Sequence, residues 1–319
     1  MKQVLEFEKP IVKLREEIEE AKKKLASKPS DKLANQISDL ERKADELQRD
    51  IHANLSPWQR VQISRHIARP FMLDYVKHIC DEFVEIHGDR HIGDDNAMPA
   101  GFATIGGQRV AILGHQKGRD TKENLLRNFG SAHPEGYRKA LRLMRMAEKF
   151  SLPIITLIDT PGAFPGIGAE ERNIAEAIAF NLREMMTLRT PVIAIVIGEG
   201  GSGGALGIGI ADRVLMMENA YYSVISPEGC AAILWKHREH APEAASALKL
   251  SAQDLSKLGV IDGIIPEPLG GAHNDHSAAA SALKEAVLAT LADLTKIPTA
   301  KLLEQRYQKF RALGQFTEA

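Results

Sequence analysis

The residues of this sequence best suited to chemistry are the glycines of GEGGSGGALGIG, from Gly198 to Gly209. They follow an apolar, β-branched segment and precede a short segment with helical character. Glycine lets another molecule approach the backbone closely, and the first N–H groups of a helix have no acceptor within it. Such N–H groups can stabilise a negative oxygen. The backbone of Gly203 and Gly204 is therefore a candidate oxyanion hole.

A dinucleotide site is one alternative interpretation of these glycines. Gly198, Gly200 and Gly203 match the pattern G-x-G-x-x-G, which holds a pyrophosphate at a helix N-terminus. Glu218 lies 20 residues beyond Gly198, where such proteins place the acid that binds the ribose. However, the helix that follows has room for at most about ten residues, and a crossover helix in such a fold is usually longer.

A serine hydrolase is a second alternative. Ser202 is the centre of a G-x-S-x-G pattern, which is typical of a nucleophile elbow, and Asp262 and His273 follow in the chain order of a catalytic triad. The tight turn of an elbow does not explain the additional glycines on either side of this serine. The glycines could also serve only the close packing of a helix against a strand.

A second loop, IDTPGAFPGIGAEER, is rich in proline and glycine and follows another apolar segment, which we expect to end at Asp159. Pro161 and Pro165 fix φ, and Gly162 and Gly166 permit sharp turns, so the loop is rigid and exposes backbone N–H groups. Open α/β folds place their sites at the carboxyl ends of such strands. Glu170 and Glu171 suit the start of a helix, and Arg172 on its first turn could face a carboxylate. A simple connection between strand and helix is the alternative.

A basic segment extends from His115 to Lys149. It contains nine lysines and arginines against four acids, in a chain whose net charge is only −1. Such a local excess could bind phosphate or another polyanion, or it could be the solvated face of a helix. The candidate residues for anion binding are Lys117, Arg119, Arg138 and Lys139.

The pattern of elements predicts an α/β fold. Apolar residues spaced three and four apart predict a helical hairpin over 11–51, with a break at SKPSD and narrow coiled-coil-like seams. We expect helices over 56–86, then short β-branched strands alternating with helices, and a hairpin at Gly106-Gly107. The expected strands are 102–105, 109–114, 153–159, 192–198, 213–217 and 221–225; the expected later helices are 134–150, 169–188, 203–210 and 277–317, the last broken near Pro298.

Composition excludes several classes of protein. The chain has 319 residues, of which 44% are hydrophobic, 26% charged and only 5% aromatic. These values are ordinary for a globular protein and argue against a disordered chain, a membrane-spanning one and a single-strand nucleic-acid binder. Two cysteines are too few for a four-cysteine zinc site, and no metal-binding spacing is present. The N-terminus has no secretory signal, so we expect a cytoplasmic protein.

Eight segments in order resemble the carboxyltransferase α subunit of bacterial multi-subunit acetyl-CoA carboxylase. They are GHQKGR, NFG, PEGYRKALRLM, IDTPGAFPG, GAEER, GEGGSGGAL, YSVISPEGCAAILWK and IIPEPLGGAH. The resemblance covers nearly the whole chain and implies a crotonase-like (ClpP/crotonase) spiral of ββα units. With the helical hairpin as a separate unit, we expect domains at 1–55, 56–272 and 273–319.

The resemblance also implies an activity and roles for individual residues. The carboxyl group of carboxybiotin passes to acetyl-CoA and gives malonyl-CoA, the first committed step of fatty acid biosynthesis. Gly203 and Gly204 match the glycine pair that holds the biotin ureido oxygen. The residues Gly162, Ala163 and Gly166 would form the adjacent pocket wall, Arg172 would contact a carboxylate or bicarbonate, and the basic residues would help to seat CoA phosphates.

The family further implies partners. The carboxybiotin is supplied on a biotin carboxyl carrier protein, and biotin carboxylase belongs to the full, ATP-dependent complex. The chain would assemble with a β subunit as an α2β2 heterotetramer, in which the β subunit carries the zinc and most of the CoA pocket. We therefore expect this chain to hold no metal and to be inactive alone, because only one set of glycine-rich donors is evident in it.

Overall fold

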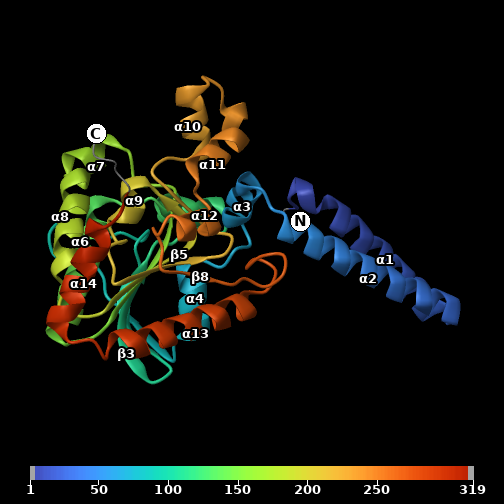
Figure 1. Ribbon diagram of the computed structural model, residues 1–319, viewed down its shortest axis with the longest axis horizontal. Helices are drawn as coiled ribbons and strands as arrows, with labels where there is room; N and C mark the ends of the chain where they lie inside the picture. Colours follow the sequence, from blue (N-terminus) through green and yellow to red (C-terminus); the bar gives the residue numbers. More distant parts are fainter. Residues whose placement is uncertain (1–3, 315–319) are drawn as a thin grey trace.

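A mixed β-sheet forms the centre of the computed structural model, which describes residues 4–314 (Figure 1). Its strand order within these residues is β1-β2-β3-β4-β5-β6-β8, with β7 paired to β5. The strands are β1 (Glu82–Glu85), β2 (Ala100–Ile105), β3 (Gln108–Gly114), β4 (Ile154–Thr160), β5 (Val192–Gly201), β6 (Arg213–Met217), β7 (Tyr221–Ser223) and β8 (Gly263–Ile265). The α/β class and the alternation of strands and helices are thus as the sequence predicts.

The antiparallel start of the sheet and its parallel centre have different causes. β2 and β3 pair antiparallel across Gly106 and Gly107, whose φ angles of 54° and 79° are readily adopted by glycine, so the predicted hairpin is confirmed. From β3 to β6 the neighbours are parallel, and every residue of β4 and β5 is buried. Continuous apolar strands of this kind belong to a parallel sheet covered on both faces.

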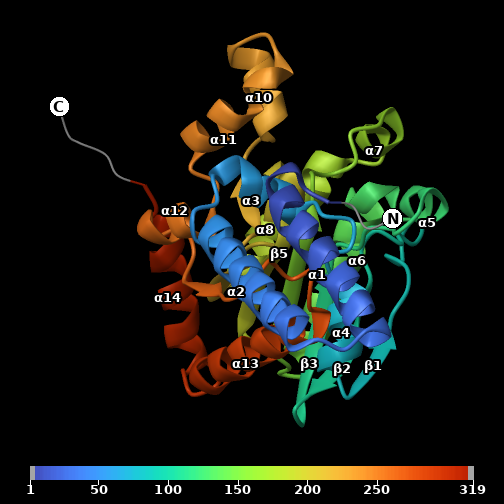
Figure 2. The same ribbon diagram turned by 90° about the vertical axis from the view of Figure 1, so that its right-hand side faces the viewer.

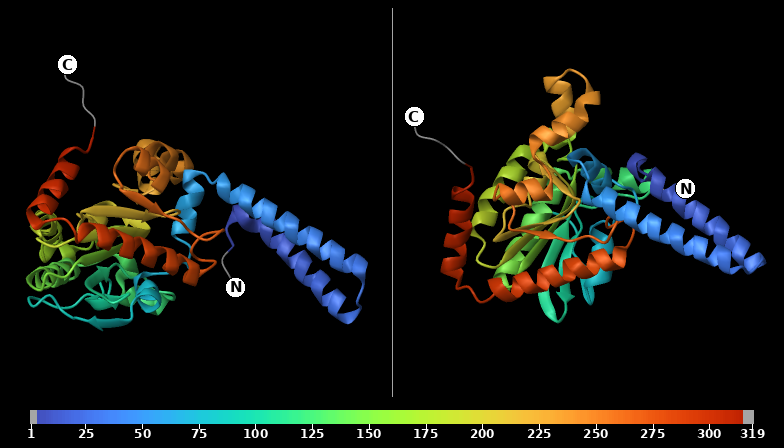
Figure 3. Two further views of the ribbon diagram at one scale, coloured as in Figure 1. Left: turned by 60° about the horizontal axis from the view of Figure 1, so that its bottom comes forward. Right: turned by 45° about the vertical axis from the view of Figure 1, so that its right-hand side comes forward.

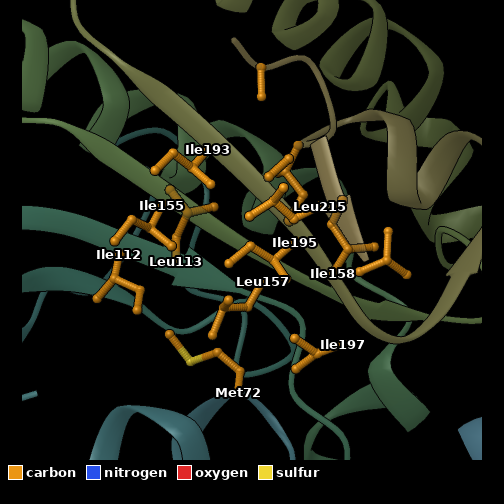
Figure 4. Close-up of a cluster of buried hydrophobic side chains, with 14 of the residues drawn as sticks. Met72, Ile112, Leu113, Ile155, Leu157, Ile158, Ile193, Ile195, Ile197 and Leu215 are labelled. Carbon is orange, nitrogen blue, oxygen red and sulfur yellow. The ribbon is translucent and has the colours of Figure 1, made fainter. Parts of the chain in front are cut away.

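Isoleucine and leucine side chains from these strands form the centre of the main core (Figure 4). Helices cover the sheet, with α6 packed on α8 and α4 packed on α13 (Figure 1). The helices are α1 (Lys9–Ser27), α2 (Asp31–Ala53), α3 (Pro57–Ser64), α4 (Met72–Ile79), α5 (Thr121–Leu126), α6 (Pro134–Lys149), α7 (Ile167–Glu171), α8 (Ile174–Thr187), α9 (Ser202–Leu206), α10 (Pro227–Leu234), α11 (Ala241–Leu248), α12 (Ala252–Lys257), α13 (His276–Leu294) and α14 (Thr299–Arg311), with short 3₁₀ turns at Glu6–Glu8, Asn128–Gly130 and Arg238–His240.

The N-terminal hairpin of α1 and α2 extends away from the body (Figures 1 and 3). Its narrow seam buries Ile18, Ala21, Ile37 and Ala44, which confirms the predicted pair of helices. Gln48 near the base of the hairpin accepts from Arg15 Nη2 at 2.6 Å and donates its Nε2 to the carbonyl of Leu269 in the body at 3.4 Å. The domain boundaries placed at residues 55 and 272 stay a prediction.

Some expected elements differ from the observed ones. The helical region expected over 56–86 ends at α4, and Glu82–Glu85 instead pairs with β2 as an edge strand. The helix expected over 169–188 divides into α7 and α8 at Asn173, whose φ of 65° interrupts helical geometry. The helix expected over 203–210 stops at Leu206, before two further glycines. The end of the last expected helix, 315–317, lies outside the described residues.

The C-terminal helix α14 is anchored by a buried arginine. The guanidinium of Arg306 is fully buried and donates to both carboxylate oxygens of Asp212, at 2.9 and 2.7 Å. It also donates to the carbonyls of Met185, Leu188 and Thr190. A planar donor with five N–H groups suits this arrangement, and it fixes α14 against the turn between α8 and β5.

Candidate active site

The glycine-rich segment and the proline- and glycine-rich loop identified in the sequence meet at the carboxyl edge of the sheet. One follows β4, and the other glycine-rich segment spans the end of β5 and the start of α9, which are directly connected. A Cβ atom at Gly204 would lie 2.5 Å from the carbonyl carbon of Gly162 and closer still to the nitrogen of Ala163. No real side chain tolerates such a contact with backbone, so this approach requires glycine at position 204. Gly203, Gly204, Gly162 and Ala163 therefore share one site.

Unpaired backbone donors line this contact. The N–H groups of Gly203 and Gly204 lie in the first turn of α9, where a helix supplies no acceptors. On the facing loop, the N–H of Gly162 donates to Thr160 Oγ1 at 3.1 Å and that of Phe164 to the carbonyl of Ala132 at 3.0 Å. Between them, the N–H of Ala163 has no acceptor among residues 4–314. Donors from two loops thus suit an anionic oxygen.

Buried side chains hold the short helix α9 in place. Tyr137 on α6 donates its hydroxyl to the carbonyl of Gly204 at 3.0 Å. Asn181 on α8 donates to the carbonyl of Gly207 at 2.9 Å, and Thr156 on β4 donates to that of Ile208 at 2.8 Å. Sequence analysis did not identify these three residues, because their partners are 67, 26 and 52 residues away in the chain.

An apolar pocket of about 340 Å³ adjoins Gly203. Its walls include Leu206, Tyr222, Val224 and, from the C-terminal helix, Phe310. A Cβ atom at Gly203 would meet only Ile178 Cδ1, at 3.9 Å, so the space in front of this residue is open. The site therefore combines backbone N–H donors with a neighbouring apolar cavity, which suits a ligand with a polar reacting end and an apolar body.

The structure pairs Arg172 with an acid of the same chain. Its Nε lies 2.7 Å from Glu135 Oε1 and its Nη2 lies 3.2 Å from Glu135 Oε2, a two-point contact. Gly166 precedes α7, where a Cβ atom would clash with the ring of Phe164. α7 lies at the same end of the molecule as α9 (Figure 1) and as α10 (Figure 2). The predicted roles of Arg172 and Gly166 in ligand contact stay predictions.

The candidate anion-binding cations also have carboxylate partners within the chain. Lys139 Nζ is buried and contacts Asp94 Oδ1 at 2.5 Å. The other pairs are Lys117 with Asp159 and Glu199, Arg119 with Asp74, and Arg138 with Asp89 and Glu135. Contact of these four cations with CoA phosphates stays a prediction, and it would require a phosphate to compete with an internal carboxylate.

The alternatives from the sequence do not assemble a site. Ser202 is exposed and has the left-handed φ of 50° expected of an elbow. However, Asp262 binds Lys309 Nζ at 2.6 Å, and the ring of His273 lies tilted against that of His66 with centroids 4.1 Å apart. Neither of them contacts Ser202, so the alternative interpretation as a catalytic triad is wrong. The dinucleotide interpretation fails because α9 has only 5 residues and ends before a crossover helix could form.

Two absences concern the described residues alone. Across residues 4–314, no cluster of three or more His, Cys, Asp or Glu side chains could hold a metal ion. Within the same range, no helix has the length and apolar character needed to cross a membrane.

Comparison with known proteins identifies similar sequences over almost the whole chain. Residues 4–314 match a family model described as acetyl co-enzyme A carboxylase carboxyltransferase-like. The acetyl-coenzyme A carboxylase carboxyl transferase subunit alpha of Geobacter metallireducens is 57% identical over 98% of this chain and 98% of that protein. The subunit of the same name from Synechococcus elongatus is 54% identical over 99% of this chain and 96% of that protein.

Solved structures share the fold at low identity. A Pseudomonas malonate decarboxylase hetero-dimer aligns with a TM-score of 0.59 and 17% identity, over 75% of this chain and 95% of that one. The transcarboxylase 12S core aligns with a TM-score of 0.54 and 21% identity over 74% of this chain. This chain covers only 46% of that longer one. The crotonase-like fold expected from the sequence is confirmed by these neighbours.

The two adjacent glycines of α9 are predicted to respond differently to alanine. Gly204→Ala forces its Cβ into the backbone of Gly162 and Ala163, and overpacking of this kind costs about 1–3 kcal/mol. Gly203→Ala places the same atom in open space, and neither glycine has a positive φ. Thermal unfolding of the two variants should show a lowered melting temperature for Gly204→Ala only. Equal melting temperatures would mean that the two loops do not approach each other as described.

Proposed function

Because the chain belongs to the family of acetyl-CoA carboxylase carboxyl transferase alpha subunits and so takes part in carboxyl transfer, we propose that its two glycine loops hold the reacting end of carboxybiotin. The observation that carries this proposal is the contact of Gly204 with Gly162 and Ala163, beside an N–H of Ala163 that has no acceptor within the described residues 4–314. It provides donors and leaves no side chain in the way.

The chemistry requires such donors. When carboxybiotin gives up its carboxyl group as CO2, negative charge develops on the ureido oxygen, and its N1′ can take a proton from the methyl group of acetyl-CoA. We propose that the N–H groups of Gly203, Gly204 and Ala163 face the position that this oxygen would occupy. Because they are fixed before the reaction, they stabilise the developing charge with little reorganisation. No side-chain base of this chain is then needed.

The surrounding residues have supporting roles in this proposal. Tyr137 holds Gly204 through its carbonyl, so the N–H groups keep their direction. The apolar pocket at Leu206 and Phe310 suits the ring system and aliphatic arm that follow the ureido group. Gly162, Ala163 and Gly166 belong to the opposite wall. Arg172 would reach a carboxylate or bicarbonate only by exchanging its contact with Glu135.

The remainder of the enzyme is proposed to lie in partner chains. The enolate of acetyl-CoA needs a second set of donors and a CoA pocket, which a β subunit of similar fold would supply, together with its zinc. The malonate decarboxylase neighbour, itself a hetero-dimer, supports such an arrangement. We further propose an α2β2 assembly in the cytoplasm, served by a biotin carboxyl carrier protein and biotin carboxylase.

Gly203→Val tests the site directly. The side chain enters the open space before α9 and obstructs its N–H groups, and its Cβ atom meets only Ile178 Cδ1, at 3.9 Å. Malonyl-CoA formation by the assembled enzyme should fall about 10²–10³-fold, the usual effect of losing an oxyanion donor. Gly203→Ala, with a smaller side chain, should lose less. Turnover within twofold of wild type for Gly203→Val, with the complex intact, would refute the assignment.

A second test concerns the partner. The purified chain alone should form no malonyl-CoA and contain no zinc, because it supplies donors for only one of the two oxyanions. Addition of the β subunit should restore activity in proportion to the complex formed. Zinc analysis and the malonyl-CoA assay are made on the same samples. Substantial turnover by the isolated, zinc-free chain would contradict a shared active site.

A further inference from the structure

The ammonium of Lys117 lies between the ends of the two strands that carry the glycine loops. Its Nζ is 2.6 Å from Asp159 Oδ1 on β4 and 2.8 Å from Glu199 Oε2 on β5. The Lys117 side chain is only 13% exposed. Asp159 is two residues before Pro161, where the first loop starts, and Glu199 is two residues before Gly201, where β5 ends and α9 follows. One cation therefore connects the bases of both loops.

The backbone ladder between these strands is interrupted at the same place. Ile158 pairs with Val196, but Thr160 pairs with Gly200, so the register shifts within two residues of β4. The N–H of Glu199 donates to Asp159 Oδ1 at 2.9 Å rather than to a main-chain carbonyl. A bulge disrupts the ladder locally, and here the Asp159 carboxylate accepts from the backbone of the neighbouring strand in its place.

The glycine at position 198 leaves space for the Asp159 carboxylate to reach the backbone of β5. A Cβ atom there would lie 2.8 Å from the carboxyl carbon of Asp159. The Asp159 carboxylate therefore occupies the position that a side chain on β5 would otherwise fill. From there it reaches both the N–H of Glu199 and the ammonium of Lys117.

Glu199 is held on its other side as well. Its Oε1 accepts from Arg65 Nε at 2.6 Å and from the Tyr221 hydroxyl at 2.8 Å. Burial alone would raise the pKa of Glu199, but the charges of Lys117 and Arg65 lower it to about 2. Asp159 and Glu199 therefore share the charge of Lys117, while Arg65 is shared between Glu199 and Glu228. Removal of Lys117 leaves two neighbouring buried carboxylates that repel each other.

We propose that Lys117 is a positioning residue, which holds Asp159 and Glu199 together and thereby sets the distance between the Ala163 and Gly204 donors. Lys117 does not touch the reacting atoms in this account. The expected effect of Lys117 on turnover rests on the proposed function of the loops. The expected effect of Lys117 on the structural rigidity of the loops does not depend on that function. The two consequences are measured separately.

The first experiment uses Lys117→Met, which keeps the length of the side chain and removes its charge. The matched control is Lys309→Met, which removes a lysine whose Nζ lies 2.6 Å from Asp262 Oδ2. The same carboxylate oxygen also accepts from the N–H of Val214 on β6. Hydrogen exchange measured by mass spectrometry on the purified chain should be at least tenfold faster at 159–166 and 200–206 in Lys117→Met only. Unchanged exchange in both segments would overturn the proposal, whatever the activity.

The second experiment measures turnover in the assembled enzyme. Lys117→Met should lower kcat at least tenfold and leave KM for acetyl-CoA within about twofold, and Lys309→Met should change neither. A raised KM with unchanged kcat would instead assign Lys117 to CoA phosphate binding and overturn positioning. Loss of exchange protection at both loops with normal turnover would retain the positioning role and contradict the proposed function of the loops.

The double variant Lys117→Met with Asp159→Asn separates positioning from stability. It removes the repulsion between carboxylates, and the asparagine still accepts from the Glu199 N–H. The melting temperature should return towards wild type while kcat stays at least tenfold low. Recovery of kcat together with the melting temperature would reduce Lys117 to a general stabilising role and refute the proposal. If Lys117→Met does not fold, this double variant provides the same comparison of kcat and exchange.

Discussion

The close approach of two backbones at the carboxyl edge of the sheet is the constraint on which the rest of the site depends. Gly204 packs against Gly162 and Ala163 so tightly that a single methyl group would force the loops apart. Backbone donors can surround one oxygen atom only if the chains approach in this way. The glycines around 201–204 and the rigid proline-containing loop are consequences of that requirement.

The close approach of the two backbones also depends on the strands and buried side chains that hold them. The parallel strands β4 and β5 bring the loops to one edge, but their ladder shifts register just before the site. Buried polar groups connect the two segments to the rest of the fold at this point. The Tyr137 hydroxyl donates to the carbonyl of Gly204 in α9, and Lys117 bridges Asp159 and Glu199. Buried charges of this kind contribute little net stability, but they are strongly destabilising when left unpaired, so they favour one arrangement of the loops.

Sequence patterns predicted the local parts of this arrangement. The β-branched segments before Asp159 and Gly198 identified the two central strands, and the glycine cluster predicted a candidate oxyanion hole at Gly203 and Gly204, at the start of α9. The strand at Glu82–Glu85 was missed because its exposed residues become a strand only by pairing with β2. Tyr137 was missed for a similar reason, since its role depends on a partner 67 residues away. The basic segment was expected to attract anions, yet its lysines at 117 and 139 bind internal carboxylates, which charge counting along the sequence does not reveal.

The most direct test of the account is a structure of the assembled carboxyltransferase with a biotin derivative bound. The account predicts that the ureido oxygen lies about 2.7–3.1 Å from backbone nitrogens of α9 and of Ala163, the distances of an oxyanion hole. The ring system should then extend into the pocket beside Leu206 and Phe310. A ureido oxygen bound elsewhere, with the N–H groups of Gly203, Gly204 and Ala163 directed at solvent or at the partner chain, would contradict it.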